Sequence, residues 1–190
     1  MTPPQPSFLD GQFLIAMPGM GDQRFERSVI FICAHSAEGA MGLIVNKPAP
    51  ELRFADLLEQ LKITGGAAAP ETRVHFGGPV EHGRGFVLHS GEYKVEGSSL
   101  RVDDDFAMTA TVEILRDMAR GAGPDRALLA LGYSGWGPGQ LESEIQANGW
   151  LTAPADKELV FGTRDSQKWA QALRSISIDP RLLSAEGGRA

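Results

Sequence analysis

Short apolar runs, separated by polar or glycine-containing connections, recur along almost the whole chain and predict a strand-rich protein. The run at residues 28–35 is dense in β-branched residues, which favour an extended conformation. We expect strands at residues 11–18, 28–35, 41–46, 74–76, 85–90, 100–102, 106–109, 126–131 and 158–161. The short connection at residues 36–39 predicts an antiparallel hairpin between the second and third of these strands.

In four segments the apolar positions take the period of an amphipathic helix. The predicted helical faces are Phe54, Leu57, Leu58 and Leu61; Val112, Leu115, Met118 and Ala119; Leu141 and Ile145; and Trp169, Ala172, Leu173 and Ile176. The second helix is expected to begin after Thr111 as its N-cap and to end at Gly121 or Gly123. The third is expected to run from Gln140 to Asn148. Because the strands come in runs and do not alternate strictly with helices, the pattern predicts an α+β fold with a mostly antiparallel sheet.

The chain has 190 residues, a length typical of one domain that can bury a core without disulfide bonds. It contains neither an internal repeat nor a linker that would divide it. The sequence therefore predicts a single domain at residues 11–180. A flexible N-terminal arm is expected at residues 1–10 and a frayed C-terminal tail at residues 181–190.

Composition narrows the classes of protein to be considered. The chain carries 18 basic and 24 acidic residues, a net charge of −6, and a field of that sign repels phosphate backbones. Direct contact with nucleic acid is therefore not expected. The single cysteine excludes an internal disulfide bond. The sequence has no apolar run long enough for a membrane span and no signal-like start, so we expect a cytoplasmic protein.

Six segments, taken together and in this order, resemble the AlgH/YqgE family of bacterial proteins. They are residues 17–22 (MPGMGD), 25–29 (FERSV), 35–48 (HSAEGAMGLIVNKP), 76–80 (FGGPV), 132–142 (GYSGWGPGQLE) and 148–150 (NGW). The resemblance extends from about Met17 to about Trp169. The family commonly has Cys-Glu-His-Asn where this chain has Cys33-Ala-His-Ser36.

The resemblance implies a single domain built on a bifurcated sheet that is curled into an incomplete barrel and flanked by helices. It implies no reaction, because the biochemical activity of the family is unassigned. The family name points to regulation of alginate synthesis, so a transcriptional regulator is one alternative. The chain nevertheless shows no helix-turn-helix pattern, basic stripe or zinc module.

The segment from Gly132 to Gly139 is the strongest candidate for a binding site. Its four glycines surround Tyr133, Ser134 and Trp136, between a predicted strand and the start of a predicted helix. Amides freed by glycine turns at such a place can bind an anion, with Gly135, Gly137 and Ser134 as donors and Trp136 as an apolar wall. The alternative is that the glycines only permit a tight strand-to-helix crossing and that Trp136 covers the core.

Other polar and glycine-rich segments could belong to the same site. Asp22, Arg24, Arg27 and Asn46 are candidates to line the same cleft as Ser134. Gly77 and Gly78 are further candidates, although residues 77–83 could equally form a simple chain reversal. The full set of binding candidates is Asp22, Asn46, Gly77, Gly78, Ser134, Gly135, Trp136, Gly137 and Gly139. The sequence thus favours a regulatory module that binds a small anionic ligand or a protein partner, in an oligomeric state that the sequence does not define.

Two enzymatic or redox alternatives remain. Ser134 lies in Gly-Tyr-Ser-Gly, near the nucleophile elbow of hydrolases, and His82 or His89 could serve as its base if folding brings them together. Trp136 occupies the fifth position, where that motif has glycine. Cys33 and His35 lie two apart on a predicted strand and could form a redox-active pair, whereas apolar neighbours favour a buried, inert thiol.

No cofactor or metal ion is predicted. His75, His82 and His89 recur every seven residues, but a spacing across strand, loop and strand defines no common ligand geometry. The acidic trio at residues 103–105 could bind a hard cation, although a solvated turn is the simpler interpretation.

Overall fold

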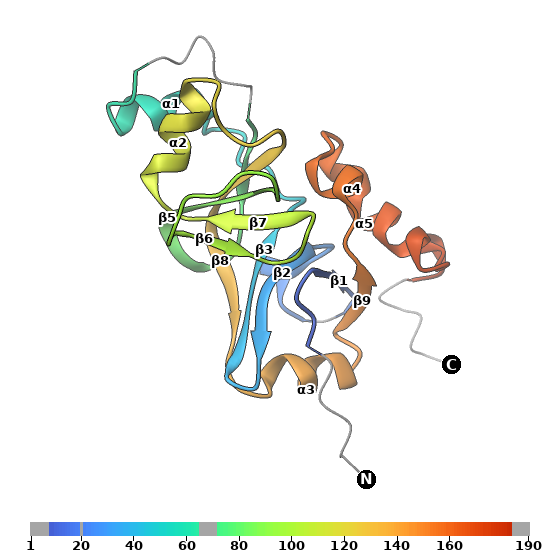
Figure 1. Ribbon diagram of the computed structural model, residues 1–190. Helices are drawn as coiled ribbons and strands as arrows, with labels where there is room; N and C mark the ends of the chain where they lie inside the picture. The colour runs from blue at the N-terminus through green and yellow to red at the C-terminus, as the bar shows by residue number, and fades with distance from the viewer. Residues whose placement is uncertain (1–7, 20, 65–71, 184–190) are drawn as a thin grey trace.

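The structure is a computed structural model that describes residues 8–19, 21–64 and 72–183. Within these residues the strands form one sheet (Figure 1). The strands are β1 (Gln12–Ala16), β2 (Val29–Ser36), β3 (Gly39–Ile44), β4 (Val74–Phe76), β5 (Val80–Ser90), β6 (Ser99–Arg101), β7 (Phe106–Thr109), β8 (Ala127–Trp136) and β9 (Trp150–Pro154). The helices are α1 (Phe54–Gln60), α2 (Val112–Ala119), α3 (Gln140–Gln146), α4 (Lys157–Phe161) and α5 (Asp165–Ser175), with 3-10 turns η1 (Gln23–Phe25) and η3 (Pro180–Leu182).

The sheet is mostly antiparallel and forks at β8. The strand order is β6-β7-β5-β8-β3-β2-β1-β9, and β4 lies off this path as a parallel neighbour of β8. Leu129 to Leu131 of β8 pair with β4, whereas Ser134 to Trp136 pair with β3. The predictions of an α+β fold and of a bifurcated, curled, mostly antiparallel sheet are therefore confirmed.

Gly132 lies at the fork and has a backbone angle φ of +72°. A Cβ atom at this position would lie 2.5 Å from the carbonyl oxygen of Gly78. A side chain would therefore be strained by the backbone angle and would also clash with the neighbouring chain. Glycine at this position allows β8 to exchange one partner strand for the next.

The central strands are buried on both faces. Phe13 and Ile15 of β1 point into one core cluster, whereas Leu14 and Ala16 point into another. Helices α4 and α5 cover the first cluster, and α3 covers the second. A third cluster packs α1 and α2 against β4, β5 and β8, at the opposite end from α3 in Figure 1. Burial on both faces explains why these strands appear in the sequence as continuous apolar runs.

Two predictions for the C-terminal third were wrong or incomplete. Residues 158–161, predicted as a strand, belong to α4, because Asp156 caps a helix start by accepting a hydrogen bond from the amide of Glu158 at 3.3 Å. A four-residue apolar run does not distinguish strand from helix by its period. The edge strand β9 was not predicted, and its last residue, Pro154, is of a type usually confined to edges and strand ends.

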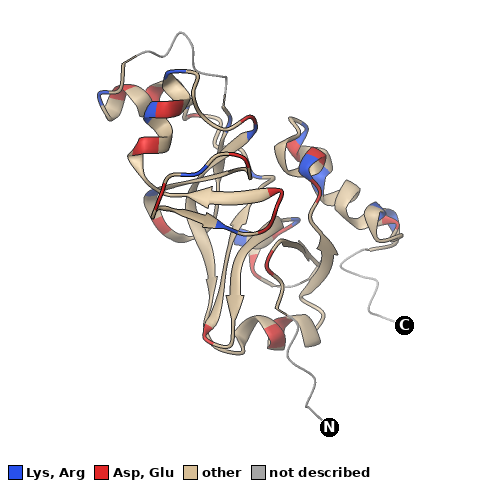
Figure 2. Ribbon diagram, viewed as in Figure 1, with Lys and Arg blue, Asp and Glu red and all other residues tan. Residues whose placement is uncertain are grey.

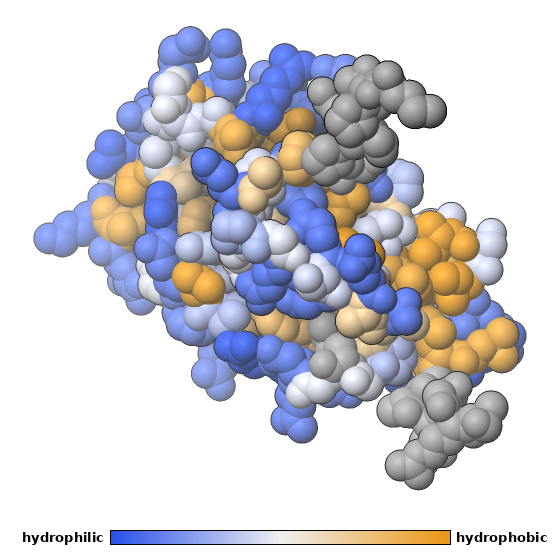
Figure 3. Space-filling model, turned by 90° about the horizontal axis from the view of Figure 1, so that it is seen from below, coloured by the Kyte–Doolittle hydropathy of each residue, from blue (hydrophilic) through white to orange (hydrophobic). Residues whose placement is uncertain are grey.

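The structure describes a few residues of each predicted chain end. In the predicted arm, the amide of Leu9 donates to Nδ1 of His35 at 3.0 Å, so residues 8–10 are anchored. In the predicted tail, Arg181 and Leu182 form part of η3, and Leu182 is 80% exposed. Figure 3 shows apolar side chains gathered on the right of the view, the side where Figure 1 places α4 and α5. Residues 1–7 and 184–190 lie outside the described residues.

Candidate functional site

The segment from Gly132 to Gly139 is mostly strand. Residues up to Trp136 belong to β8, and only residues 137–139 connect it to α3. Gly135 faces Met41 in the β3–β8 ladder, and the amide of Gly137 donates to Oε1 of Gln140 at 3.0 Å. Gly135 therefore lies in a strand ladder and the amide of Gly137 is engaged, so the segment is not the glycine turn with free amides on which the anion hypothesis was based.

Ser134 does not have the environment of a nucleophile. Its side chain is fully buried, and its hydroxyl donates to the carbonyl oxygen of Gly77 at 3.2 Å. A Cβ atom on Gly78 would lie 2.1 Å from the carbonyl carbon of Tyr133, so residues 77 and 78 are glycines because they pack directly against β8. The hydrolase alternative is thereby corrected: Ser134 joins two segments of backbone.

The candidate histidines do not approach Ser134. Both ring nitrogens of His89 are engaged, Nε2 with the Thr109 hydroxyl at 2.8 Å and Nδ1 with the carbonyl oxygen of Ser90 at 2.9 Å. Burial lowers the pKa of His89, which favours the neutral ring. His82 is exposed, and its ring stacks on Phe76 with centroids 5.6 Å apart. Neither imidazole serves the serine as a base.

Cys33 and His35 do not form a pair. The strand register shifts between Ile32 and Ala34, which breaks the simple alternation that predicted a common face. Cys33 packs in the first core cluster, where burial and the nearby Asp10 raise its pKa to about 12. His35 accepts from Leu9 at Nδ1, so its Nε2 carries the hydrogen and donates to Glu142 at 2.5 Å. His35 therefore joins the N-terminal segment to α3.

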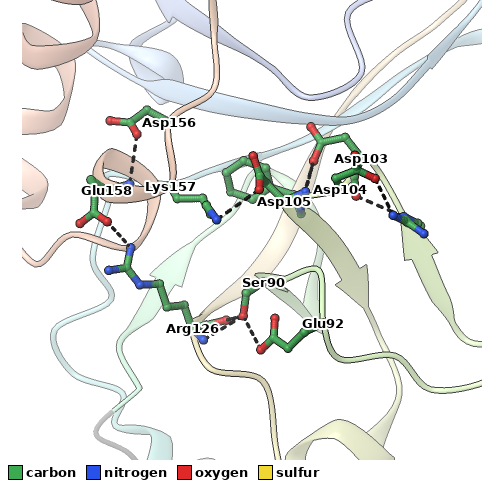
Figure 4. A network of polar contacts seen from close by, with 11 residues as sticks. Ser90, Glu92, Asp103, Asp104, Asp105, Arg126, Asp156, Lys157 and Glu158 are labelled. Atoms are coloured by element: carbon green, nitrogen blue, oxygen red, sulfur yellow. Dashed lines mark hydrogen bonds and ion pairs between the residues drawn. The ribbon is translucent and has the colours of Figure 1, made fainter.

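Each carboxylate of the acidic trio has its own partners (Figure 4). Asp103 accepts hydrogen bonds from the amides of Asp105 and Phe106, Asp104 pairs with Arg101 at 2.6 Å, and Asp105 pairs with Lys157 at 3.2 Å. Within the described ranges, no group of three or more histidine, cysteine or acidic side chains could hold a metal ion. The trio forms a turn and ties it to α4.

A cleft of about 700 Å³ brings several of the predicted residues together. We call it the α3 cleft, because α3 forms one wall and the segment around η1 forms the opposite wall. Of the sequence candidates it contains Asp22, Gly135 and Trp136, and Phe25, Gln140 and Glu144 also line it. Asn46 lines a separate cleft beside α5. Asp22 and Arg24 therefore line one cleft with Gly135 and Trp136, whereas Arg27 and Asn46 line the other and Ser134 does not line the α3 cleft.

Glu144 is held in the wall of the α3 cleft by three hydrogen bonds. Its Oε1 accepts from the indole nitrogens of Trp136 at 3.3 Å and Trp150 at 3.1 Å, and its Oε2 accepts from Nε2 of Gln140 at 3.0 Å. In the part of the chain that the structure describes, no basic side chain lies within ion-pair distance of this carboxylate. Sequence reasoning missed Glu144, although its position four residues after Gln140 places both side chains on one helical face.

The opposite wall carries an ion pair. Arg24 donates to Asp22 through Nε at 3.0 Å and through its terminal nitrogen at 2.7 Å. The hydrogen bond from Arg24 holds the pKa of Asp22 below its usual range. Since Arg24 neutralises Asp22, the carboxylate of Glu144 leaves the α3 cleft with a net negative charge.

A buried charged cluster lies beside α5 and was also missed. Asp165 accepts from His75 at 3.1 Å, from Lys168 at 2.9 Å and from Arg73 at 2.7 Å. Lys168 also donates to the carbonyl oxygens of Val45 and Val160 at 2.8 and 2.9 Å. These bonds link α5 to β4, to α4 and to Val45, the residue that follows β3, so the cluster has a structural role.

In the view of Figure 2, basic and acidic residues are interspersed and form no continuous basic stripe. Among residues 8–19, 21–64 and 72–183, none of the helices combines the length and hydrophobicity that a membrane crossing requires.

Comparison with known proteins gives consistent matches over almost the whole chain. Residues 13–181 match the AlgH-like family model DUF179. A UPF0301 protein from Paracoccus denitrificans is 58% identical over 98% of this chain and 99% of its own, and one from Ruegeria pomeroyi is 62% identical over 96% and 99%. The solution structure of AlgH from Pseudomonas aeruginosa is 38% identical, covers 100% of both chains and has a TM-score of 0.79. A crystal structure of a Corynebacterium diphtheriae protein, 21% identical with a TM-score of 0.72, shares the fold.

Proposed function

The chain belongs to the AlgH-like family, a family of uncharacterised biochemical function, and on that premise we propose that it is a binding module whose α3 cleft takes a small ligand carrying an amine. One observation carries this proposal. The carboxylate of Glu144 is held in the cleft wall by two indoles and one amide, without a cationic partner among the described residues.

The hydrogen bonds to Glu144 support a role in binding. A carboxylate has about four acceptor sites, and three are occupied by Trp136, Trp150 and Gln140. The remaining site suits a donor from a ligand. Because the three bonds are already made, the carboxylate loses little conformational freedom when the ligand binds.

The other walls define the rest of the ligand. Phe25 and Trp136 provide flat apolar surface, and Pro18, Pro79 and Val80 extend it. A cleft of about 700 Å³ is within the usual range for small-molecule sites. The ligand would therefore combine an amine with a flat apolar part, unlike the anion that the glycine pattern predicted.

The test is calorimetric titration with three probes that share a phenyl ring and differ in the charge of their polar group: benzylamine, benzyl alcohol and benzoate. We expect saturable binding of benzylamine only, and a loss of about tenfold in affinity in Glu144→Gln. Glu59→Gln is the matched control, because Glu59 is exposed on α1, at the far end of the molecule (Figure 1). Thermal unfolding without ligand verifies that both variants are folded. Tighter binding of benzoate than of benzylamine, or equal binding by Glu144→Gln and wild type, overturns the proposal.

A further inference from the structure

Phe25 lines the α3 cleft, and the next residue, Glu26, lines a second cleft. This α5 cleft has a volume of about 410 Å³ and lies between the end of β3 and the start of α5. Its walls include Arg27, Asn46, Lys47, Asp165, Ser166 and Trp169. The function proposed for the α3 cleft does not depend on this second cleft.

Two cations face this cleft without a carboxylate partner. Among the described residues, no acidic side chain lies within ion-pair distance of Arg27 or Lys47. The guanidinium of Arg27 lies over the ring of Trp169, 5.0 Å from its centroid, and Nζ of Lys47 donates to the carbonyl oxygen of Arg24 at 2.8 Å. Both side chains are thus positioned by neutral groups, and neither forms an ion pair within the described residues.

The acidic residues near the cleft do not cancel the positive charge of Arg27 and Lys47. Asp165 is occupied by Lys168, Arg73 and His75, and Arg181, which also lines the cleft, is paired with Asp179 at 2.8 Å. Of the acidic residues that line the cleft, this leaves Glu26 to balance the charges of Arg27 and Lys47. The α5 cleft is therefore locally positive in a chain whose net charge is −6.

The two cations are also held in place relative to each other. Asn46 donates from Nδ2 to the carbonyl oxygen of Arg27 at 2.8 Å and accepts at Oδ1 from the amide of Val29 at 2.9 Å. Arg27 has a backbone angle φ of +54°, which this side-chain bond helps to maintain. Burial lowers the pKa of Lys47, although Glu26 and Asp22 oppose that shift. A bound anion would restore the favourable interaction that its partly buried ammonium lacks.

We propose that the α5 cleft binds a phosphate group, with Arg27 and Lys47 as its ligands. A guanidinium donates to phosphate oxygens in a forked geometry and an ammonium adds a point charge, so the two side chains complement each other on one dianion. The cleft is larger than a phosphate ion and leaves room for the remainder of a small phosphate ester. Free phosphate and phosphate esters share this chemistry.

The experiment titrates the full-length protein with inorganic phosphate and with glycerol phosphate, against sodium chloride at equal ionic strength. Affinity is measured by calorimetry and stability by thermal unfolding. The double variant Arg27→Gln with Lys47→Met removes both cations. Its matched control, Arg116→Gln with Lys62→Met, removes the same charge from exposed positions on α2 and beyond α1. We expect saturable phosphate binding that falls at least about tenfold in the first double variant and is retained in the control.

Each outcome bears on the proposal. Tighter binding of glycerol phosphate indicates an ester as the ligand, and tighter binding of inorganic phosphate indicates the free ion. No saturable binding of either probe, or an equal loss in both double variants, overturns the site. If the first double variant does not fold, Lys47→Met alone is compared with Lys62→Met. Glu144→Gln should retain phosphate binding, which separates this result from the test of the α3 cleft.

Discussion

Burial removes the reactivity of Cys33, the residue that the sequence offered as a redox centre. Burial raises the pKa of its thiol to about 12, so very little thiolate is present near pH 8. We predict that iodoacetamide does not label the native protein on a timescale that labels a free thiol, and labels it fully in denaturant. Mass spectrometry measures the labelling, with Cys33→Ala as the blank. Rapid labelling of the folded protein would restore the redox hypothesis.

Asp165 makes the stability of the protein depend on pH. Burial tends to raise its pKa, but the hydrogen bonds from His75 and Lys168 outweigh burial and hold the pKa below its usual range. Because the folded pKa is depressed, the stabilisation is present above the unfolded pKa of about 3.9 and is lost as the pH falls through the folded value. The stability of the wild type should therefore decline below about pH 4.

The substitution Asp165→Asn tests this account, because it leaves Lys168 buried without a counter-ion. We expect a loss of about 3–5 kcal/mol in the free energy of unfolding at neutral pH, and a smaller difference from wild type near pH 3. Urea denaturation at both pH values measures the effect. Asp105→Asn breaks the exposed pair with Lys157 and should cost less than about 1 kcal/mol. A difference that does not shrink in acid contradicts the assignment.

Among the elements, β8 needs the left-handed backbone at Gly132, where the sheet forks. We predict that Gly132→Ala lowers the free energy of unfolding by at least about 2 kcal/mol, since the left-handed backbone and the clash with Gly78 both act. Gly83→Ala is the matched control, because a Cβ atom there meets nothing within 4 Å. Chemical denaturation of both variants provides the comparison. Equal stability of the two would show that the fork of the sheet does not need glycine.

At the scale of the whole molecule, β8 joins regions that could otherwise unfold separately. It pairs with β3, β4 and β5, and residues on its two faces enter all three core clusters. Tryptophan fluorescence reports on the half of the molecule that contains β1 and β9. Trp136 and Trp150 pack in the second cluster and Trp169 packs in the first. The helices α1 and α2 lie at the other end.

We therefore predict one cooperative unfolding transition, although the chain is longer than most two-state domains. Tryptophan fluorescence and far-ultraviolet circular dichroism should give the same urea midpoint. The Gly132→Ala variant, which weakens the fork, is the informative comparison, because it should shift both signals together. Two separate midpoints in the wild type would contradict the prediction and indicate that the ends of the sheet unfold independently.

Local signals made the fold largely predictable. The strands at residues 74–76 and 106–109 and the start of α1 at Phe54 agree with the sequence analysis, because period and flanking turn residues act within a few positions. Predictions failed where distant partners decide. The run at residues 158–161 is apolar in either conformation, and β9 became visible only through its pairing with β1.

The sequence by itself determined the family, the fold class and the positions of most strands and helices. Only the tertiary structure decided which side chains remain available. Ser134 and His89 are buried and hydrogen-bonded, and Cys33 is packed in the core. Glu144, Arg27 and Lys47 line clefts and form no ion pair within the described residues. The physical reason is that chemical availability depends on burial and on partners distant in the chain, which no local pattern of residues encodes.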